Sequence, residues 1–298
     1  MEPGGQFANP HSIASAQWLE THLGDPSIVV VDTRFTVKID DRGDFRSVPG
    51  RGGYEESHIQ GAVFLDLLDL RDPDEPRHIL DPSAFAEAMS GAGIGNDHEV
   101  VVYDTEGGTW AARLWWALRY HGHEAVRVLN GGFANWQRLG LPTRSGNQER
   151  PSSRFIPDVL GDLRVDIDDV LVAIDEPGVA IVDALPEPFY TGQVPLYPHL
   201  RAGHIPSAWN VSALANIDPS TWMLLPRDEL AAMWEPVIGD ADRIVTYCGG
   251  GVYAAFDLFV LHLLGHDAAL YDGSWEEWGA SEHTPVETGP DPTRSEES

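Results

Sequence analysis

Short apolar runs alternate with longer segments of helical spacing along most of the chain. The runs are almost continuously hydrophobic and rich in β-branched residues: "IVVVD" (28–32), "EVVVYD" (99–104), "VAIVD" (179–183) and "RIVTY" (243–247). Such runs are typical of parallel strands that are covered on both faces. Helical segments such as "AARLWWALRY" and "AAFDLFVLHLL" follow them. The alternation predicts an α/β fold built from small, doubly wound and mostly parallel sheets flanked by helices.

The pattern occurs twice, and its period is too long for a solenoid, so it indicates a duplicated domain. The matching pairs are Asp32 and Asp183, His58 and His204, Tyr103 and Tyr247, and Trp136 and Trp278. The two histidines recur although only one copy holds a cysteine, which favours structural roles for them. We predict an N-terminal domain over residues 12–144, a linker over 145–158, a C-terminal domain over 159–289 and a disordered tail over 290–298.

Charge narrows the choice of partners. The 298 residues include 47 acidic and 19 basic side chains, which gives a formal net charge of -28. Such an acidic surface repels phosphate backbones and anionic lipids, so we expect no nucleic-acid partner and no membrane partner. The first residues lack the basic and apolar regions of a signal peptide, and no apolar run reaches transmembrane length. A cytoplasmic location is therefore expected.

The one cysteine, Cys248, follows an apolar strand and precedes a glycine run. A single cysteine excludes an intramolecular disulfide and a multi-cysteine metal site, and we expect neither a metal nor a cofactor. Reactive groups of open α/β sheets lie beyond the carboxyl ends of strands. Glycines allow successive N–H groups to point into one concavity, where they and the helix N-terminus favour an anion and lower a thiol pKa. We predict Cys248 as a nucleophile rather than a buried structural thiol, in an active-site loop that continues through Gly249, Gly250, Gly251, Val252 and Tyr253.

The matching position of the first copy holds Asp104, in "VVVYDTEGGTW". A carboxylate cannot perform the chemistry of a thiol nucleophile. Duplication followed by loss of the nucleophile in one half accounts for the difference. The N-terminal domain is therefore predicted to be a non-catalytic scaffold.

Several motifs resemble those of the rhodanese superfamily, in particular its two-domain sulfurtransferases of the 3-mercaptopyruvate and thiosulfate type. They are "YEESHIQGAVFL", "AGHIPSAWNV", "ALYDGSWEEW" and its degenerate twin "NGGFANW", and the resemblance extends from about residue 12 to residue 289. It implies two tandem rhodanese-like domains, with Cys248 of the second carrying sulfane sulfur as a persulfide. The implied partners are a small sulfur donor and an external acceptor such as thioredoxin, a low-molecular-weight thiol or cyanide.

The resemblance also bears on the donor. The uncharged loop "CGGGVY" is similar to the Cys-Gly-Ser-Gly-Val-Thr loop of 3-mercaptopyruvate sulfurtransferases, which implies that donor rather than thiosulfate. In those enzymes the loop serine works with a histidine and an aspartate of the first domain. His78 falls on that histidine, and Asp66 or Asp69 lies near that aspartate, whereas the serine position is Gly250.

The chain departs from the family at two arginines that bind the substrate carboxylate. In "DALPEPFYTG", Leu185 and Phe189 occupy their positions, and Arg201 is the candidate replacement. A partner-fed persulfide relay or binding protein with little turnover on free donors is therefore the alternative function. A phosphatase on a similar fold is disfavoured, because its loop needs an arginine six residues after the cysteine and Ala254 stands there.

Overall fold

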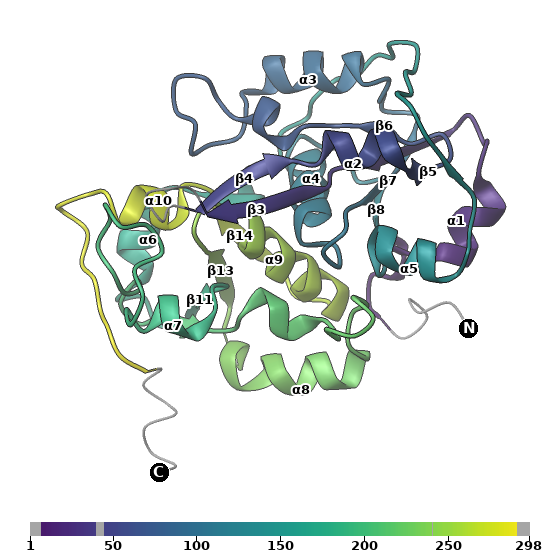
Figure 1. Ribbon diagram of the computed structural model, residues 1–298. Coiled ribbons are helices and arrows are strands. Elements are labelled where there is room, and N and C mark those ends of the chain that lie inside the picture. The colour runs from purple at the N-terminus through teal and green to yellow at the C-terminus, as the bar shows by residue number, and fades with distance from the viewer. Residues whose placement is uncertain (1–6, 40–44, 240, 291–298) are drawn as a thin grey trace. The chain divides into compact units, whose positions relative to one another are not determined.

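The computed structural model describes residues 7–39, 45–239 and 241–290, which divide into two compact units (Figure 1). Unit 1 comprises the described residues within 1–36, 47–161 and 217–224, and unit 2 those within 37–46, 162–216 and 225–298. Each unit therefore includes a short segment from the other half of the chain. The predicted linker, 145–158, belongs to unit 1, where Gln148 N–H donates to the Tyr54 hydroxyl at 3.1 Å. Residues 291–298 of the predicted tail lie outside the described residues.

Unit 1 is built on a five-stranded parallel sheet in the order β1-β8-β7-β2-β6. Its strands are β1 (Ile13–Ala14), β2 (Ile28–Asp32), β6 (Val63–Phe64), β7 (Glu99–Tyr103) and β8 (Val126–Leu129). Its helices are α1 (Ala16–His22), α2 (Arg51–Glu56), α3 (Pro82–Gly91), α4 (Thr109–Tyr120) and α5 (Gly132–Arg138), with 3₁₀ turns η2 (Pro10–Ser12) and η3 (Leu67–Leu70). A short antiparallel pair joins β5 (His58–Ile59) to β9 (Thr143–Arg144).

Unit 2 repeats this topology with a parallel sheet in the order β10-β14-β13-β11-β12. Its strands are β10 (Arg164–Val165), β11 (Val179–Asp183), β12 (Trp209–Asn210), β13 (Arg243–Tyr247) and β14 (Ala268–Tyr271). Its helices are α6 (Ile167–Ala173), α7 (Glu187–Tyr190), α8 (Arg227–Ile238), α9 (Val252–Leu264) and α10 (Ser274–Trp278), with the 3₁₀ turn η5 (Ala213–Asn216). The turn η4 (Gly161–Leu163) precedes β10, and β3 (Phe35–Ile39) pairs with β4 (Phe45–Pro49).

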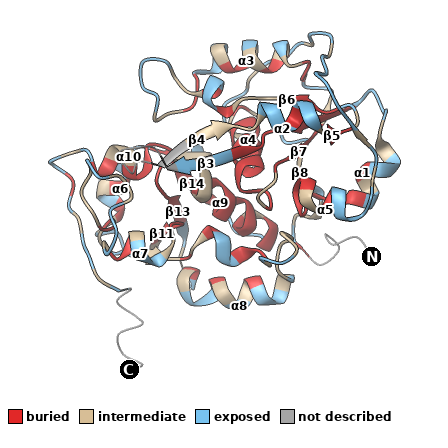
Figure 2. Ribbon diagram, in the orientation of Figure 1, coloured by how far each residue is buried: buried red, intermediate tan, exposed pale blue. Residues whose placement is uncertain are grey.

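The two sheets confirm the predicted pair of doubly wound α/β domains. Their central strands are almost wholly buried, which explains why the apolar runs show no alternation (Figure 2). In register, Asp32 lies opposite Tyr103 and Asp183 opposite Tyr247, so the paired strands end at the same edge. The residue that follows each pair, Asp104 or Cys248, is therefore brought to the carboxyl edge of its own sheet.

Helix α9 is buried along most of its length, as expected for a helix that is apolar on nearly all sides. It follows directly on the loop that starts at Cys248 and packs against β13 and β14. Strand β13 holds the N-terminal end of the loop, and α9, which packs against the same sheet, holds its C-terminal end. Among the described residues, no helix is long and apolar enough to cross a membrane.

Candidate active site

The loop that holds Cys248 joins β13 to α9, as the sequence predicted. The strand ends at Tyr247 and the helix begins at Val252. Gly251 precedes the helix with φ of 76°, a left-handed conformation that glycine adopts without strain. At the other end of α9, Gly265 has φ of 97° and closes the helix, which matches the expected C-cap.

Helix α10 holds the loop in place through hydrogen bonds to the loop's main chain. The Cys248 N–H donates to Ser274 Oγ at 3.2 Å, and the Trp275 N–H donates to the Cys248 carbonyl at 2.9 Å. The Glu276 N–H donates to the Gly249 carbonyl at 2.9 Å. The signature "DGSWEEW" is thus the segment that fixes the loop's backbone, which gives a physical reason for its presence beside the cysteine.

Cys248 is 3% exposed, and its thiol lies among backbone N–H groups. Burial raises its pKa, the N–H groups of Ala254, Gly250 and Tyr253 lower it, and the nearby Asp183 carboxyl raises it. The net direction is upward, so the expectation of a lowered thiol pKa is wrong for the free cysteine. The three N–H groups nevertheless bear on the sulfur, as expected for a glycine-rich loop that leads into a helix.

Three side chains border the loop. A Cβ on Gly249 would lie 2.7 Å from Leu196 Cδ2 and 3.4 Å from the Tyr197 hydroxyl oxygen, so a larger residue there would make the Leu196 side chain shift. A Cβ on Gly250 would lie 3.2 Å from Glu276 Oε1, which accepts a hydrogen bond from the Tyr197 hydroxyl at 2.7 Å. The sequence reasoning did not single out Glu276. The repeat offered one indication of its importance, because the matching position in the first copy holds Ala134 rather than an acidic residue.

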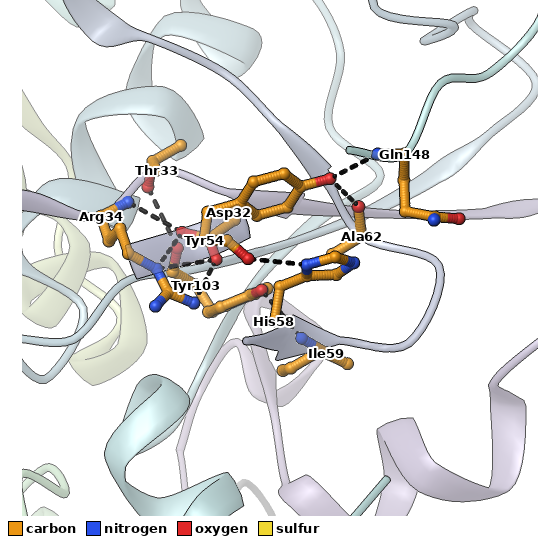
Figure 3. A network of polar contacts seen from close by, with 9 residues as sticks. All are labelled: Asp32, Thr33, Arg34, Tyr54, His58, Ile59, Ala62, Tyr103 and Gln148. Atoms are coloured by element: carbon orange, nitrogen blue, oxygen red, sulfur yellow. Dashed lines mark hydrogen bonds and ion pairs between the residues drawn. The ribbon is translucent and has the colours of Figure 1, made fainter. Parts of the chain in front are cut away.

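Both strand-end tyrosines belong to a polar network that the two units share, drawn for unit 1 in Figure 3. There His58 Nδ1 bonds to the Tyr54 carbonyl at 2.8 Å, and the Ile59 N–H donates to the Tyr103 hydroxyl at 3.1 Å. The Tyr54 hydroxyl donates to the Ala62 carbonyl at 2.8 Å. These bonds support the structural role predicted for the repeated histidines.

Unit 2 repeats these three bonds. His204 Nδ1 bonds to the Tyr190 carbonyl at 2.8 Å, and the Ile205 N–H donates to the Tyr247 hydroxyl at 3.0 Å. The Tyr190 hydroxyl donates to the Ala208 carbonyl at 2.6 Å. The frame around the carboxyl edge of each sheet is therefore the same in the two units.

One member of the network differs between the units. Asp32 forms an ion pair with Arg34, whose Nη2 lies 2.5 Å from Oδ2 (Figure 3). The matching Asp183 has Leu185 instead, from which it receives only a backbone N–H, at 2.8 Å. Burial raises the pKa of Asp183 to about 7, against the lowering effects of the Leu185 N–H and the Tyr247 hydroxyl. The carboxyl beside the thiol can therefore hold a proton near neutral pH.

Asp104 occupies in unit 1 the place that Cys248 has in unit 2. Its Oδ1 accepts hydrogen bonds from the N–H groups of Glu106 at 2.8 Å and Gly108 at 2.9 Å. Its Oδ2 accepts from those of Trp110 at 2.8 Å and Ala111 at 3.0 Å. The side chain is fully buried, so the carboxylate fills the cradle of N–H groups that precedes α4.

The remaining predicted residues have other environments. Arg201 donates from all three guanidinium nitrogens to its own unit: Nε to the Gly279 carbonyl, Nη1 to the Thr284 carbonyl and Nη2 to the Trp278 carbonyl, at 3.2, 2.6 and 2.6 Å. A substrate anion would have to displace these bonds, so the geometry gives Arg201 a structural role and disfavours the predicted role of anion anchor.

The predicted relay residues belong to unit 1. Asp66 caps η3 by accepting the Leu68 N–H at 2.9 Å, and burial raises the pKa of its carboxyl, with Asp69 acting in the same direction. His78 closes the following loop through its backbone, because its carbonyl accepts the Asp72 N–H at 2.9 Å. Asp66 and Asp69 are thus neighbours, and a relay role for these residues and His78 stays a prediction.

Fold and site together define a class: a tandem pair of α/β domains in which only the second keeps a cysteine loop. The rhodanese-like domain profile matches residues 15–139 and 166–281. The chain is 38% identical over 278 residues to the 3-mercaptopyruvate sulfurtransferase of Escherichia coli (strain K12), covering 91% of this chain and 96% of that protein. It is 33% identical to the sulfur carrier protein TtuD of Thermus thermophilus, covering 95% of this chain and 99% of that protein.

A solved structure shows the same fold. The crystal structure of SseA from Escherichia coli, described as a 3-mercaptopyruvate sulfotransferase, superposes with a TM-score of 0.78 at 34% identity and covers 89% of this chain and 98% of that one. The chain therefore belongs to the rhodanese family. Its recognition as a two-domain sulfurtransferase of that superfamily, and hence as an enzyme, is confirmed.

Proposed function

We propose that this sulfurtransferase carries sulfane sulfur as a persulfide on Cys248, taken from 3-mercaptopyruvate in preference to thiosulfate. The observation that carries the proposal is the position of the thiol among the N–H groups of Ala254, Gly250 and Tyr253, at the N-terminus of a buried helix. Such a cradle favours an anion that forms at the cysteine during the reaction.

In the proposed cycle, the Cys248 thiolate attacks the sulfur of the donor. A new S–S bond forms, the C–S bond of mercaptopyruvate breaks, and its electron pair leaves as the enolate of pyruvate, which takes up the proton that the thiol gave. The persulfide then ionises toward the loop N–H groups. An acceptor thiolate or cyanide attacks the outer sulfur, and the Cys248 thiolate leaves. The chain has no second cysteine, so the acceptor is external.

Charge supports mercaptopyruvate as the donor. The loop itself carries no charge, and Leu185 and Phe189 stand where the family has carboxylate-binding arginines. A site with few cations accepts a monoanion more readily than a dianion such as thiosulfate. His78, with Asp66 or Asp69, is proposed to polarise the substrate carbonyl. Gly250 supplies no hydroxyl to this relay, which leaves it one polar group short.

A second candidate is a relay that receives sulfur from a partner's persulfide and turns over free donors poorly. The absence of arginine at 185 and 189 favours it, because a protein donor needs no clamp for a small anion. A relative that covers nearly the whole chain is named a sulfur carrier protein. Thioredoxin, a low-molecular-weight thiol or cyanide would accept the sulfur in either case.

The test is the intact mass of the protein after exposure to each donor without reductant. We expect the mass of one sulfur atom to be gained with mercaptopyruvate, and none in Cys248→Ser, whose turnover should fall on the order of a thousandfold or more. Circular dichroism and the melting temperature of Cys248→Ser control for folding. Loading by thiosulfate alone would overturn the choice of donor. A free thiol after both treatments would favour the partner-fed relay.

A further inference from the structure

We propose that Glu276 selects the molecules that reach Cys248 by their charge, admitting neutral molecules and monoanions ahead of dianions. The proposal deepens the function proposed above, because it assigns the preference for mercaptopyruvate over thiosulfate to one side chain. It concerns a residue that borders the nucleophile's loop and takes no part in bond making.

The carboxylate of Glu276 is held against the loop from two sides. Its backbone N–H donates to the Gly249 carbonyl at 2.9 Å, which fixes its Cα beside the loop. Its Oε1 accepts the Tyr197 hydroxyl at 2.7 Å, which fixes the direction of the side chain. Both oxygens lie near Gly250, at 3.2 Å and 3.6 Å from the place of a Cβ there.

Gly250 connects this carboxylate to the reacting atom. The Gly250 N–H is one of the three that bear on the Cys248 thiol, so a molecule that approaches the sulfur comes within a few ångströms of the loop's surface. Glu276 is half-buried, and a charge in such a place is less screened than one in open solvent. An anion that approaches the thiol therefore comes close to a fixed negative charge.

The repeat supports a role that is specific to the unit with the thiol. Position 276 corresponds to Ala134, which stands in the helix beside the Asp104 loop of unit 1. The neighbouring Glu277 corresponds to Asn135 and has a different contact, because its Oε2 accepts the Tyr271 hydroxyl at 2.8 Å. A carboxylate is thus present beside the nucleophile's loop and absent from the matching place in the other unit.

Alkylation of Cys248 tests the proposal without any sulfur transfer. Iodoacetate is an anion and iodoacetamide its neutral analogue, and the single cysteine makes the labelling unambiguous. Glu276→Gln removes the charge and keeps the acceptor for Tyr197. We expect it to raise the rate constant with iodoacetate about threefold relative to that with iodoacetamide, as expected for a screened like-charge pair, since the neutral reagent corrects for any change in the thiolate fraction. Glu277→Gln is the matched control and should change neither rate.

Donor kinetics then extend the test to the proposed function. Because the Coulomb energy scales with the donor's charge, Glu276→Gln should raise kcat/KM about threefold for mercaptopyruvate and about tenfold for thiosulfate, through KM. Added salt should raise the wild-type value for thiosulfate more than that of the variant. An unchanged ratio of the two alkylation rates, or the same effect from Glu277→Gln, would overturn the role of Glu276. Altered alkylation without any persulfide would leave that role intact and overturn the proposed function instead.

Discussion

The loops after β7 and β13 solve the same structural problem with different groups. Each connects the central strand of a parallel sheet to a buried helix, and each gathers backbone N–H groups around the first residue after the strand. In unit 1 four N–H groups are satisfied by the Asp104 carboxylate. In unit 2 they surround the Cys248 thiol, whose pKa burial raises. The comparison teaches that the same cradle of N–H groups holds a carboxyl in unit 1 and a thiol in unit 2.

A second difference between the units lies at the end of the neighbouring strand, β2 in unit 1 and β11 in unit 2. Asp32 has a guanidinium partner in Arg34, whereas Asp183 has the apolar Leu185. In unit 1, which lacks a thiol, the carboxyl has a positively charged neighbour. In unit 2, which contains Cys248, the residue at the matching position is apolar. An uncompensated buried carboxyl takes up a proton, which spares the thiolate a negative neighbour near neutral pH.

The largest effect is expected from emptying the cradle of unit 1. Asp104→Ala leaves four N–H groups, three of them buried, without this acceptor, which should lower the free energy of unfolding by about 4 kcal/mol. Urea unfolding of the wild type and the variant measures this difference in stability. Asp104→Asn, which keeps one oxygen, should lose less. A loss below about 1 kcal/mol for Asp104→Ala would show that water or another group satisfies these donors equally well.

The second prediction concerns the pH dependence of stability. The Asp183 pKa rises from 3.8 in the unfolded chain to about 7 in the folded one, so its contribution to stability is full below pH 3.8 and is lost as the pH rises toward 7. Between pH 5 and pH 8 the loss amounts to about 3 kcal/mol. Leu185→Arg should supply the missing guanidinium, lower this pKa and remove that part of the pH dependence. Urea unfolding at both pH values gives the difference.

The reciprocal change, Arg34→Leu, serves as the control in unit 1. It leaves Asp32 in the surroundings that Asp183 has now, so stability should acquire a new decrease with rising pH. Identical pH dependence in wild type, Leu185→Arg and Arg34→Leu would show that these arginine positions do not govern the two carboxyls.

The smallest effect is expected at Arg201. The matching position in unit 1 holds Glu55, which cannot donate the hydrogen bonds that Arg201 makes. Arg201→Ala should lower the free energy of unfolding by about 2 kcal/mol, since the carbonyls of Trp278, Gly279 and Thr284 each lose one donor. Arg201→Lys should recover only part, because an ammonium lacks the planar fork. KM for the donor should stay unchanged, and a raised KM at full stability would restore the role of anion anchor.

The sequence was sufficient for the fold and for the position of Cys248, because both depend on local pattern. Apolar runs and their repetition define the sheets, and the position of Cys248 after one run places it at the sheet's edge. The direction of the thiol pKa was not predictable in this way, since burial arises from the packing of α9 and α10 around the loop. The role of Arg201 depends on the fold bringing residues 278–284 next to it. The role of Glu276 depends on a side-chain contact with Tyr197. Neither is written in a local motif.

The division of the chain also has a consequence in time. Unit 1 includes residues 217–224, and the Leu224 N–H donates to Asn130 Oδ1 at 2.9 Å within it. During synthesis from the N-terminus, the five strands of the unit 1 sheet leave the ribosome before residues 217–224 do. The first domain therefore cannot be completed at that moment. The last pieces arrive only after α6, α7, β11 and β12 of the second domain have been synthesised. The two domains are copies in sequence, yet their final assembly is interleaved rather than successive.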